Sequence, residues 1–177
     1  MLCQFTGQEN DSLLGDLYDF PKDVYSIGRL DKDSEGLLLM TNDNRFKTRL
    51  LEPKYRTPKT YYAQVDGAIT DDAVRELSEG KIIIKHKGKS HQVAPAVCRK
   101  LEDPNFPERS VPIRYRKNIP TSWVSLTISE GKNRQVRKMT AAVGFPTLRL
   151  IRFSIGNYNL GNMQPGDVVE ITPDQVL

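Results

Sequence analysis

Cysteine and histidine are scarce in this sequence. Among 177 residues there are two cysteines, Cys3 and Cys98, and two histidines, His86 and His91. The cysteines lie far apart and form no C-x2–4-C pair, so neither a zinc site nor a disulfide framework is expected. A Ser-His-Asp hydrolase is not expected either, because both histidines fall in one lysine-rich stretch that has the pattern of a hairpin. With no secretory signal, we expect a reducing, cytoplasmic environment.

Long apolar runs are absent as well. No stretch approaches the roughly 20 residues needed to cross a bilayer, so no membrane contact is expected. Low-complexity tracts and internal repeats are also missing, and hydrophobic residues make up 38% and charged residues 27% of the chain. These proportions are typical of a globular protein. At this length we expect one domain over residues 1–177, with room for two lobes.

Positive charge is concentrated in one part of the chain. The formal net charge is only +4, yet residues 109–152 hold ten Lys or Arg and one acid, Glu130. A basic half on an otherwise acidic chain is suited to phosphates and would draw a polyanion to one face. The distribution favours a nucleic-acid partner, although a solvated basic face without a partner is the plainer alternative.

Hydrophobic periodicity predicts a mixed α/β (α+β) domain. Strands outnumber helices and most connections are short, which favours a largely antiparallel sheet with helices on one side. Helices are predicted over residues 44–51, with Asn42 or Asp43 as N-cap, over 70–80 and over 132–143. The segment 99–120, with four prolines, is expected to be loop or edge strand. Strands are predicted over residues 24–30, 36–41, 59–65, 82–85, 91–97, 122–129, 147–155 and 168–172.

A charged turn precedes a buried apolar run in the segment from Gly28 to Asn42, GRLDKDSEGLLLMTN. Asp31 at this turn is the first candidate for chemistry, and Arg137, on the flank of a predicted helix, is the candidate cation for it. One interpretation makes Asp31 a nucleophile or base with Arg137 as its charge partner. The other makes them a structural ion pair, and from spacing alone this second interpretation is the commoner one.

The same turn resembles the start of a calcium-binding loop, with Asp31, Asp33, Glu35 and Gly36 at the right spacing. The twelfth position of such a loop should be a bidentate Glu, and here it is Asn42. A strand is also predicted where the loop should lead into a helix. We therefore expect no metal site.

Three motifs, in the same order, resemble those of RNA pseudouridine synthases of the RsuA family. They are GRLDKDSEGLLLMTND from Gly28, KTYYAQV from Lys59 and EGKNRQVRKM from Glu130, the last followed by IRFSIGNYNLGNMQPGD. The resemblance covers essentially the whole chain and implies the family fold, a mixed sheet with flanking helices and a central cleft. It implies isomerisation of a uridine in ribosomal RNA, with 23S RNA of the large subunit expected, and needs no cofactor.

The resemblance also implies roles for individual residues. Asp31 matches the catalytic nucleophile, Tyr61 the tyrosine that stacks on the target base and takes the final proton, and Arg137 the arginine that pairs with the nucleophile. Because the target is hidden in stacked RNA, its nucleotide must be flipped into the cleft. The candidates for RNA contact are Arg29, Lys59, Arg114, Arg116, Lys132, Arg134, Lys138, Arg149 and Arg152.

Two departures from the family pattern concern the N-terminus. Many relatives carry an S4 RNA-binding module, which is not found here, and an expected Asn-Lys-Pro sequence before residues 2–6 is missing. The expectation is a monomeric catalytic domain, trimmed at its N-terminus, that binds neither DNA nor membrane. The runner-up is a non-catalytic ribosomal RNA-binding or assembly protein with the same basic face, and a glycosylase is a third interpretation.

Overall fold

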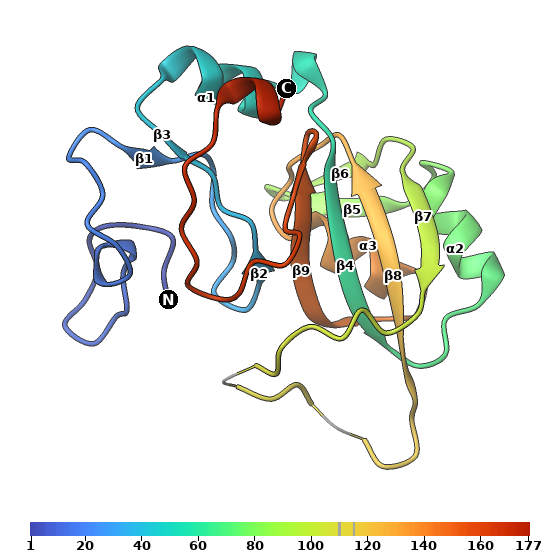
Figure 1. Ribbon diagram of the computed structural model, residues 1–177. Coiled ribbons are helices and arrows are strands. Elements are labelled where there is room, and N and C mark those ends of the chain that lie inside the picture. Colours follow the sequence, from blue (N-terminus) through green and yellow to red (C-terminus); the bar gives the residue numbers. More distant parts are fainter. Residues whose placement is uncertain (110, 115) are drawn as a thin grey trace.

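A central antiparallel sheet organises the computed structural model, which describes residues 1–109, 111–114 and 116–177. Its strands follow the order β10-β9-β4-β8-β7 (Figure 1). A short strand, β2, Glu35–Gly36, pairs in parallel with β9. The predicted mixed α/β class is therefore confirmed. The bounds of the five strands are Tyr158–Asn159 for β10, Thr147–Ile155 for β9, Lys59–Asp66 for β4, Thr121–Ile128 for β8 and Val97–Leu101 for β7.

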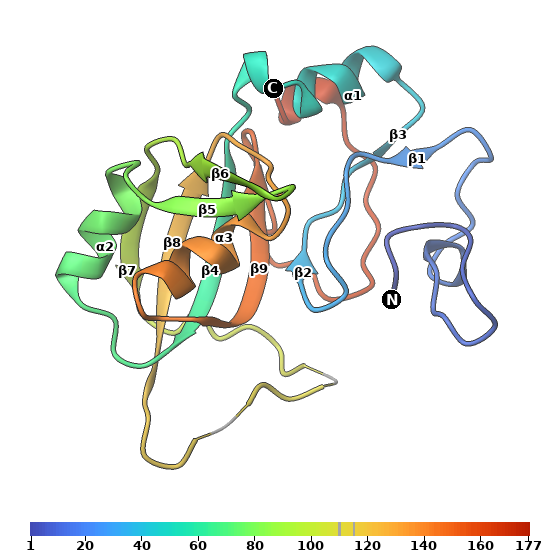
Figure 2. The ribbon, with the colours of Figure 1, turned by 180° about the vertical axis from the view of Figure 1, so that it is seen from behind.

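One face of this sheet is covered by helices α2, Asp71–Ser78, and α3, Gln135–Ala142, and by a separate hairpin, β5 and β6 (Figure 2). The hairpin strands are Ile83–His86 and Lys89–Gln92. Alternate side chains of β4 and β8 point toward these elements, so Ala63, Val65, Val124 and Leu126 are fully buried. Tyr61, two residues before Ala63, packs against the same core, as the alternation of side chains along a strand over 59–65 predicts.

A side lobe packs against the edge of the sheet at β9 (Figure 1). It contains β1, Tyr25–Ser26, paired with β3, Met40–Thr41, and helix α1, Asn44–Leu51. Three 3-10 turns, η1, η2 and η3, span Leu14–Asp16, Pro53–Tyr55 and Pro173–Gln175. Leu39, Phe46, Leu50 and Val176 form a second core here, and Ile155 of β9 joins it. Strand β9 therefore contributes to both cores, since its Leu150 lies in the first.

Of the two N-caps predicted for α1, Asp43 is confirmed, and Thr70, where the second helix was predicted to begin, is the N-cap of α2. Asp43 precedes α1 and its carboxylate accepts hydrogen bonds from the backbone N–H groups of Arg45 and Phe46. Thr70 accepts one from Ala73 at the start of α2, where acidic residues in the first turn complement the helix dipole. Of the described helices, none is both long enough and apolar enough to cross a membrane.

Several predicted boundaries are wrong. The run over 36–41 is split into β2 and β3, because the N–H of Leu37 still bonds to β9 while the carbonyl of Leu39 already accepts from Ile27 in the side lobe. The chain thus crosses between the two lobes within three residues. Helix α3 begins at Gln135 and not at 132, because Arg134 has a left-handed backbone with φ of 51°.

Other differences lie in the connections. Residues 97–101 form the edge strand β7, and over 99–101 this agrees with the loop or edge strand expected there. Residues 93–96 interrupt the strand predicted over 91–97. No strand forms over 168–172. Within the segment 99–120, residues 110 and 115 lie outside the described residues, and the described residues over 102–120 are not strand.

Candidate active site

An open pocket of about 540 Å³ lies between the two lobes. The predicted nucleophile Asp31 lines it from the loop between β1 and β2, and Tyr61 and Lys59 line it from β4. Of the predicted RNA contacts, Arg29, Lys59, Lys132, Arg134 and Arg152 also line it. Leu39 and Leu50 of the side lobe supply an apolar wall. The structure thus brings together residues from all three sequence motifs.

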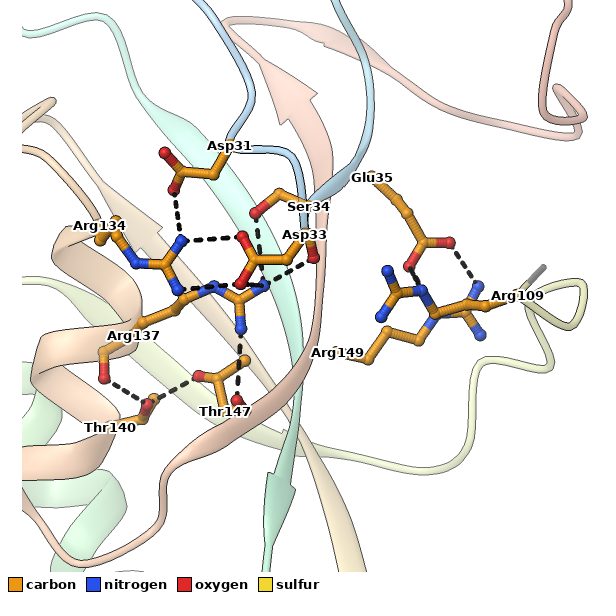
Figure 3. Close-up of polar contacts among 10 residues, drawn as sticks. All are labelled: Asp31, Asp33, Ser34, Glu35, Arg109, Arg134, Arg137, Thr140, Thr147 and Arg149. Atoms are coloured by element: carbon orange, nitrogen blue, oxygen red, sulfur yellow. Dashed lines mark hydrogen bonds and ion pairs between the residues drawn. The ribbon is translucent and has the colours of Figure 1, made fainter. Parts of the chain in front are cut away.

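Asp31 faces Arg134, which also lines the pocket (Figure 3). The distance from Nη1 of Arg134 to Oδ2 of Asp31 is 3.6 Å. The same guanidinium donates two hydrogen bonds to both carboxylate oxygens of Asp33, at 2.8 and 2.9 Å. The left-handed backbone at Arg134 ends the 130–134 loop and turns this side chain toward the 31–34 loop.

Arg137, the predicted partner of Asp31, instead holds the backbone of the 31–34 loop. Its Nη2 donates to the carbonyl of Asp33 at 2.8 Å, and its Nη1 donates to the carbonyl of Thr147 on β9 at 3.3 Å (Figure 3). Its side chain is only 10% exposed, and this burial lowers the pKa of the guanidinium. Within the described residues no ion pair joins Arg137 to Asp31, although the charge of Asp31 still acts on the Arg137 guanidinium. The direct contact predicted for Arg137 is therefore corrected: Arg134 makes it instead.

Asp33 is the carboxylate on which both arginines converge. The hydrogen bond from Arg134 is the largest influence on it and, with the positive charges of Arg137 and Arg134, lowers its pKa despite partial burial. Asp33 thus fixes the two arginines relative to each other. Because they also contact Asp31 and the loop backbone, Asp33 positions the loop that carries the nucleophile candidate.

Replacing Asp33 by Asn is expected to lower stability in a pH-dependent way. A carboxyl whose pKa is depressed by folding stabilises the protein above its unfolded pKa, about 3.9, and loses that contribution as pH falls through the folded pKa. The side chain is 47% exposed, so water screens the pair and we expect a loss of under about 1 kcal/mol, or about 2 °C in melting temperature, at pH 7. Thermal melts by circular dichroism between pH 7 and pH 3 measure it.

The control for this prediction is Asp19→Asn. Asp19 is exposed and makes no ion pair within the described part of the chain, so the same change of charge should leave the melting temperature unchanged at every pH. The difference between wild type and Asp33→Asn should shrink as pH falls below 4. A difference of constant size down to pH 3 would contradict the ionic role of Asp33.

Lys59 and Arg152 place two cations together on the floor of the pocket. Arg152 is 5% exposed and its Nε donates to the carbonyl of Leu37 at 2.8 Å. Lys59 donates to the carbonyl of Thr57 at 3.1 Å, and burial, followed by the charge of Arg152, lowers its pKa. Like charges held this close in a half-buried site favour an oxygen-rich ligand.

Arg149, predicted to contact RNA, is instead committed to Glu35. Its guanidinium donates to both carboxylate oxygens at 2.9 and 3.0 Å and to the carbonyl of Pro107 at 2.8 Å. Arg109 pairs with Glu35 from the other side at 3.0 Å (Figure 3). Because side chains alternate along β9, Arg149 and the pocket residue Leu150 face opposite sides of the sheet. Its charge is therefore neutralised away from the pocket.

Three further predicted RNA contacts lie outside the pocket lining. Arg116 pairs with Asp66 at 3.2 Å, and Lys138 donates to the carbonyl of Lys85 at 2.9 Å. Arg114 is exposed. These residues stay predictions as peripheral contacts. Asp33 and Glu35, which a calcium loop would use as ligands, are each paired with arginine.

The sequence interpretation missed His86 and Lys87, which line the pocket from the tip of the β5–β6 hairpin. The sequence could have indicated a basic surface here, because residues 81–92, KIIIKHKGKSHQ, contain four lysines, two histidines and no acid. It also missed the arginine-binding roles of Asp33 and Glu35. For these, the sequence offers only acidic residues in a turn, which is common at any surface.

Comparison with known proteins shows the family. A family model described as RNA pseudouridylate synthase matches residues 1–142. The chain is 47% identical to "Ribosomal large subunit pseudouridine synthase E" of Vibrio parahaemolyticus over 170 residues, 96% of this chain and 69% of the relative. It is 45% identical over 150 residues to the protein of the same name in Xanthomonas campestris, 84% of this chain and 78% of the relative.

A solved structure shows the same fold. It is described as "Crystal structure of pseudouridylate synthase" and aligns with a TM-score of 0.76 at 27% identity, covering 99% of this chain and 67% of that one. The chain therefore belongs to the RNA pseudouridine synthase family. It is an enzyme of that family, as the motif resemblance predicted, and its substrate is an RNA.

Proposed function

We propose that this enzyme isomerises one uridine of large-subunit ribosomal RNA to pseudouridine, with Asp31 as nucleophile. The observation that carries the proposal is the pocket in which Asp31 at the mouth and Tyr61 on the floor strand face one space. The names of the relatives from Vibrio and Xanthomonas support the large subunit as the source of the RNA. The two cores share β9, which supports action as a single catalytic unit.

The proposed reaction balances without a co-reactant. The carboxylate of Asp31 attacks C1′ of the ribose, and the bond from C1′ to N1 of uracil breaks with its electron pair on N1. The detached base turns within the pocket, and its C5 then bonds to C1′ as Asp31 leaves. The proton on C5 is removed and N1 gains one, so that the product is an isomer of the substrate.

The surrounding residues have positioning roles in this proposal. Tyr61 stacks on the flipped base and takes the C5 proton. Arg134 orients the Asp31 carboxylate by their ion pair, and Arg137 holds the backbone of its loop. Flipping the nucleotide costs a few kcal/mol, which stacking and phosphate contacts offset. Arg29, Lys132 and Arg152 line the pocket and are the proposed phosphate or base contacts.

Separate substitutions of Arg134 and Arg137 by Gln are expected to have different effects. Because Arg134 orients Asp31, its loss should lower kcat about tenfold or more. Because its side chain is 40% exposed, the melting temperature should stay within about 2 °C of the wild-type value. The side chain of Arg137 is only 10% exposed and donates to two backbone carbonyls, so its loss should lower the free energy of unfolding by about 2–3 kcal/mol as well as activity. Single-turnover assays and denaturant titrations separate the two effects. Equal stability of both variants would contradict these assignments.

Base mapping in cells tests the function itself. Ribosomal RNA from cells that lack this protein is modified with carbodiimide and read by reverse-transcription stops. One pseudouridine should be missing from the large-subunit RNA, and it should return with a wild-type copy but not with an Asp31→Ala copy. An unchanged map would favour the non-catalytic RNA-binding alternative, and release of free uracil by the purified protein would favour a glycosylase.

A further inference from the structure

The hairpin of β5 and β6 is a basic element with three lysines that have no acidic partner among the described residues, although its His91 contacts Glu130 at 3.0 Å. Its segment from Lys81 to Gln92 contains no acid. Lys81, at its base, is paired with Glu79 at 2.9 Å. Lys85, Lys87 and Lys89 are exposed, and none of them has an ion-pair partner within the part of the chain that the structure describes. A cluster of unpaired lysines on one element favours a polyanionic ligand.

The hairpin is held firmly against helix α3 (Figure 2). Ile84 is buried in the main core, and Lys138 of α3 donates to the carbonyl of Lys85 at 2.9 Å. Lys87 and Gly88 form the tip with positive φ angles of 49° and 77°, which is the geometry of a tight two-residue turn. The basic tip is therefore presented by a fixed scaffold.

The tip stands at the rim of the pocket. His86 and Lys87 line the pocket together with Lys132 from the loop before α3. The pKa of His86 is lowered, first by burial and then by the positive charges of Lys132, Lys87, Lys138 and His91. Cations from the hairpin and the 130–134 loop thus line the same pocket, and Lys138 of α3 lies close to His86 without lining the pocket.

We propose that the tip of the β5–β6 hairpin binds the sugar–phosphate backbone next to the flipped uridine, with Lys87 and Lys89 as phosphate contacts. The inference rests on RNA being the substrate. When a nucleotide enters the pocket, the phosphates on either side of it must lie close to the pocket opening. The hairpin tip lines the pocket together with Lys132, so it is placed to contact these phosphates. These lysines raise the affinity for RNA and do not touch the reacting atoms.

The test compares two double variants that remove the same charge. Lys87→Gln with Lys89→Gln alters the hairpin tip. Lys22→Gln with Lys54→Gln alters two exposed lysines outside the pocket lining and serves as the matched control. The probe is a fluorescein-labelled stem–loop RNA of about 30 nucleotides with uridines in its loop. Binding is measured by anisotropy between 50 and 200 mM KCl, and melting temperatures show that both variants are folded.

The hairpin variant should bind the probe about tenfold more weakly at 100 mM salt. The slope of log Kd against log salt should fall by about 1.5, since two phosphate contacts are lost. On rRNA from cells lacking this protein, KM should rise with kcat unchanged. The control should differ from wild type by less than about twofold. Equal effects in both variants, or wild-type binding by the hairpin variant, would overturn the proposal.

The two proposals fail in distinguishable ways. If wild-type protein forms no pseudouridine in large-subunit rRNA but the hairpin variant alone loses affinity for the probe, the choice of substrate is wrong and the hairpin surface stands. If wild type modifies the rRNA and the hairpin variant matches the control in both affinity and KM, the substrate stands and the hairpin proposal is wrong.

Discussion

Substitution of Asp31 by Asn should abolish pseudouridine formation while the protein remains folded and bound to RNA. A nucleophile that forms a covalent bond to the substrate has no substitute in the pocket, so we expect kcat to fall by at least about 10⁴-fold. Asp31 is partly exposed and its ion pair with Arg134 is long, at 3.6 Å, so stability should change by under about 1 kcal/mol. Release of tritium from RNA labelled at C5 of uridine measures the reaction directly.

Asp33→Asn is the matched comparison for this result. It makes the same change of atoms two residues away, in a carboxylate that bonds to Arg134 and not to the substrate. We expect its kcat to fall by under about tenfold, through looser positioning of the 31–34 loop. Asp31→Ala guards against slow deamidation of the introduced asparagine, which would restore the carboxylate. Comparable losses in the Asp31 and Asp33 variants would show that charge in this loop, and not a covalent step at Asp31, supports the reaction.

Substitution of Gly36 by Ala should be among the most destabilising changes in the chain. Gly36 has φ of 104°, a conformation that is essentially restricted to glycine. A Cβ there would lie 2.6 Å from the backbone N of Arg152 and closer still to its carbonyl oxygen, where β2 meets β9. We expect the free energy of unfolding to fall by more than about 4 kcal/mol, with a melting temperature lower by about 10 °C or more.

Gly144→Ala separates the two causes of that loss. Gly144 also has a positive φ, 88°, but a Cβ there would meet no atom within 4 Å. Its substitution should therefore cost only the backbone strain, about 1–2 kcal/mol. Denaturant titration of both variants gives the comparison. Similar losses in the two would mean that β2 and β9 do not approach as closely as the structure shows.

Local chemistry made part of this fold predictable. The cap residues Asp43 and Thr70 mark helix starts because a short side-chain oxygen satisfies free N–H groups. The alternation of β4 placed Tyr61 on the core side. By contrast, the interruption between β2 and β3 arises because Leu37 hydrogen-bonds to β9 while Leu39 hydrogen-bonds to the side lobe. The hydrophobic pattern of residues 36–41 contains no information about these long-range partners.

The partner of Asp31 shows why the site was predicted only in part. The motifs identified Asp31 and the 130–139 segment, but the arginine that contacts Asp31 lies just before α3, where the backbone is left-handed. Arginine seldom adopts this conformation, and nothing in the sequence around Arg134 predicts it. The role of Arg149 was open to prediction, because alternation along the strand over 147–155 separates it from the pocket residues.

The position of strand β9 has a consequence for how this protein unfolds. It pairs with β4, β10 and β2, and it places Leu150 in one core and Ile155 in the other. A side lobe that detached would expose apolar side chains of a strand on which the main core also depends. We therefore expect the two lobes to open together rather than one at a time, with the amide hydrogens of β9 exchanging with solvent only when the whole chain unfolds.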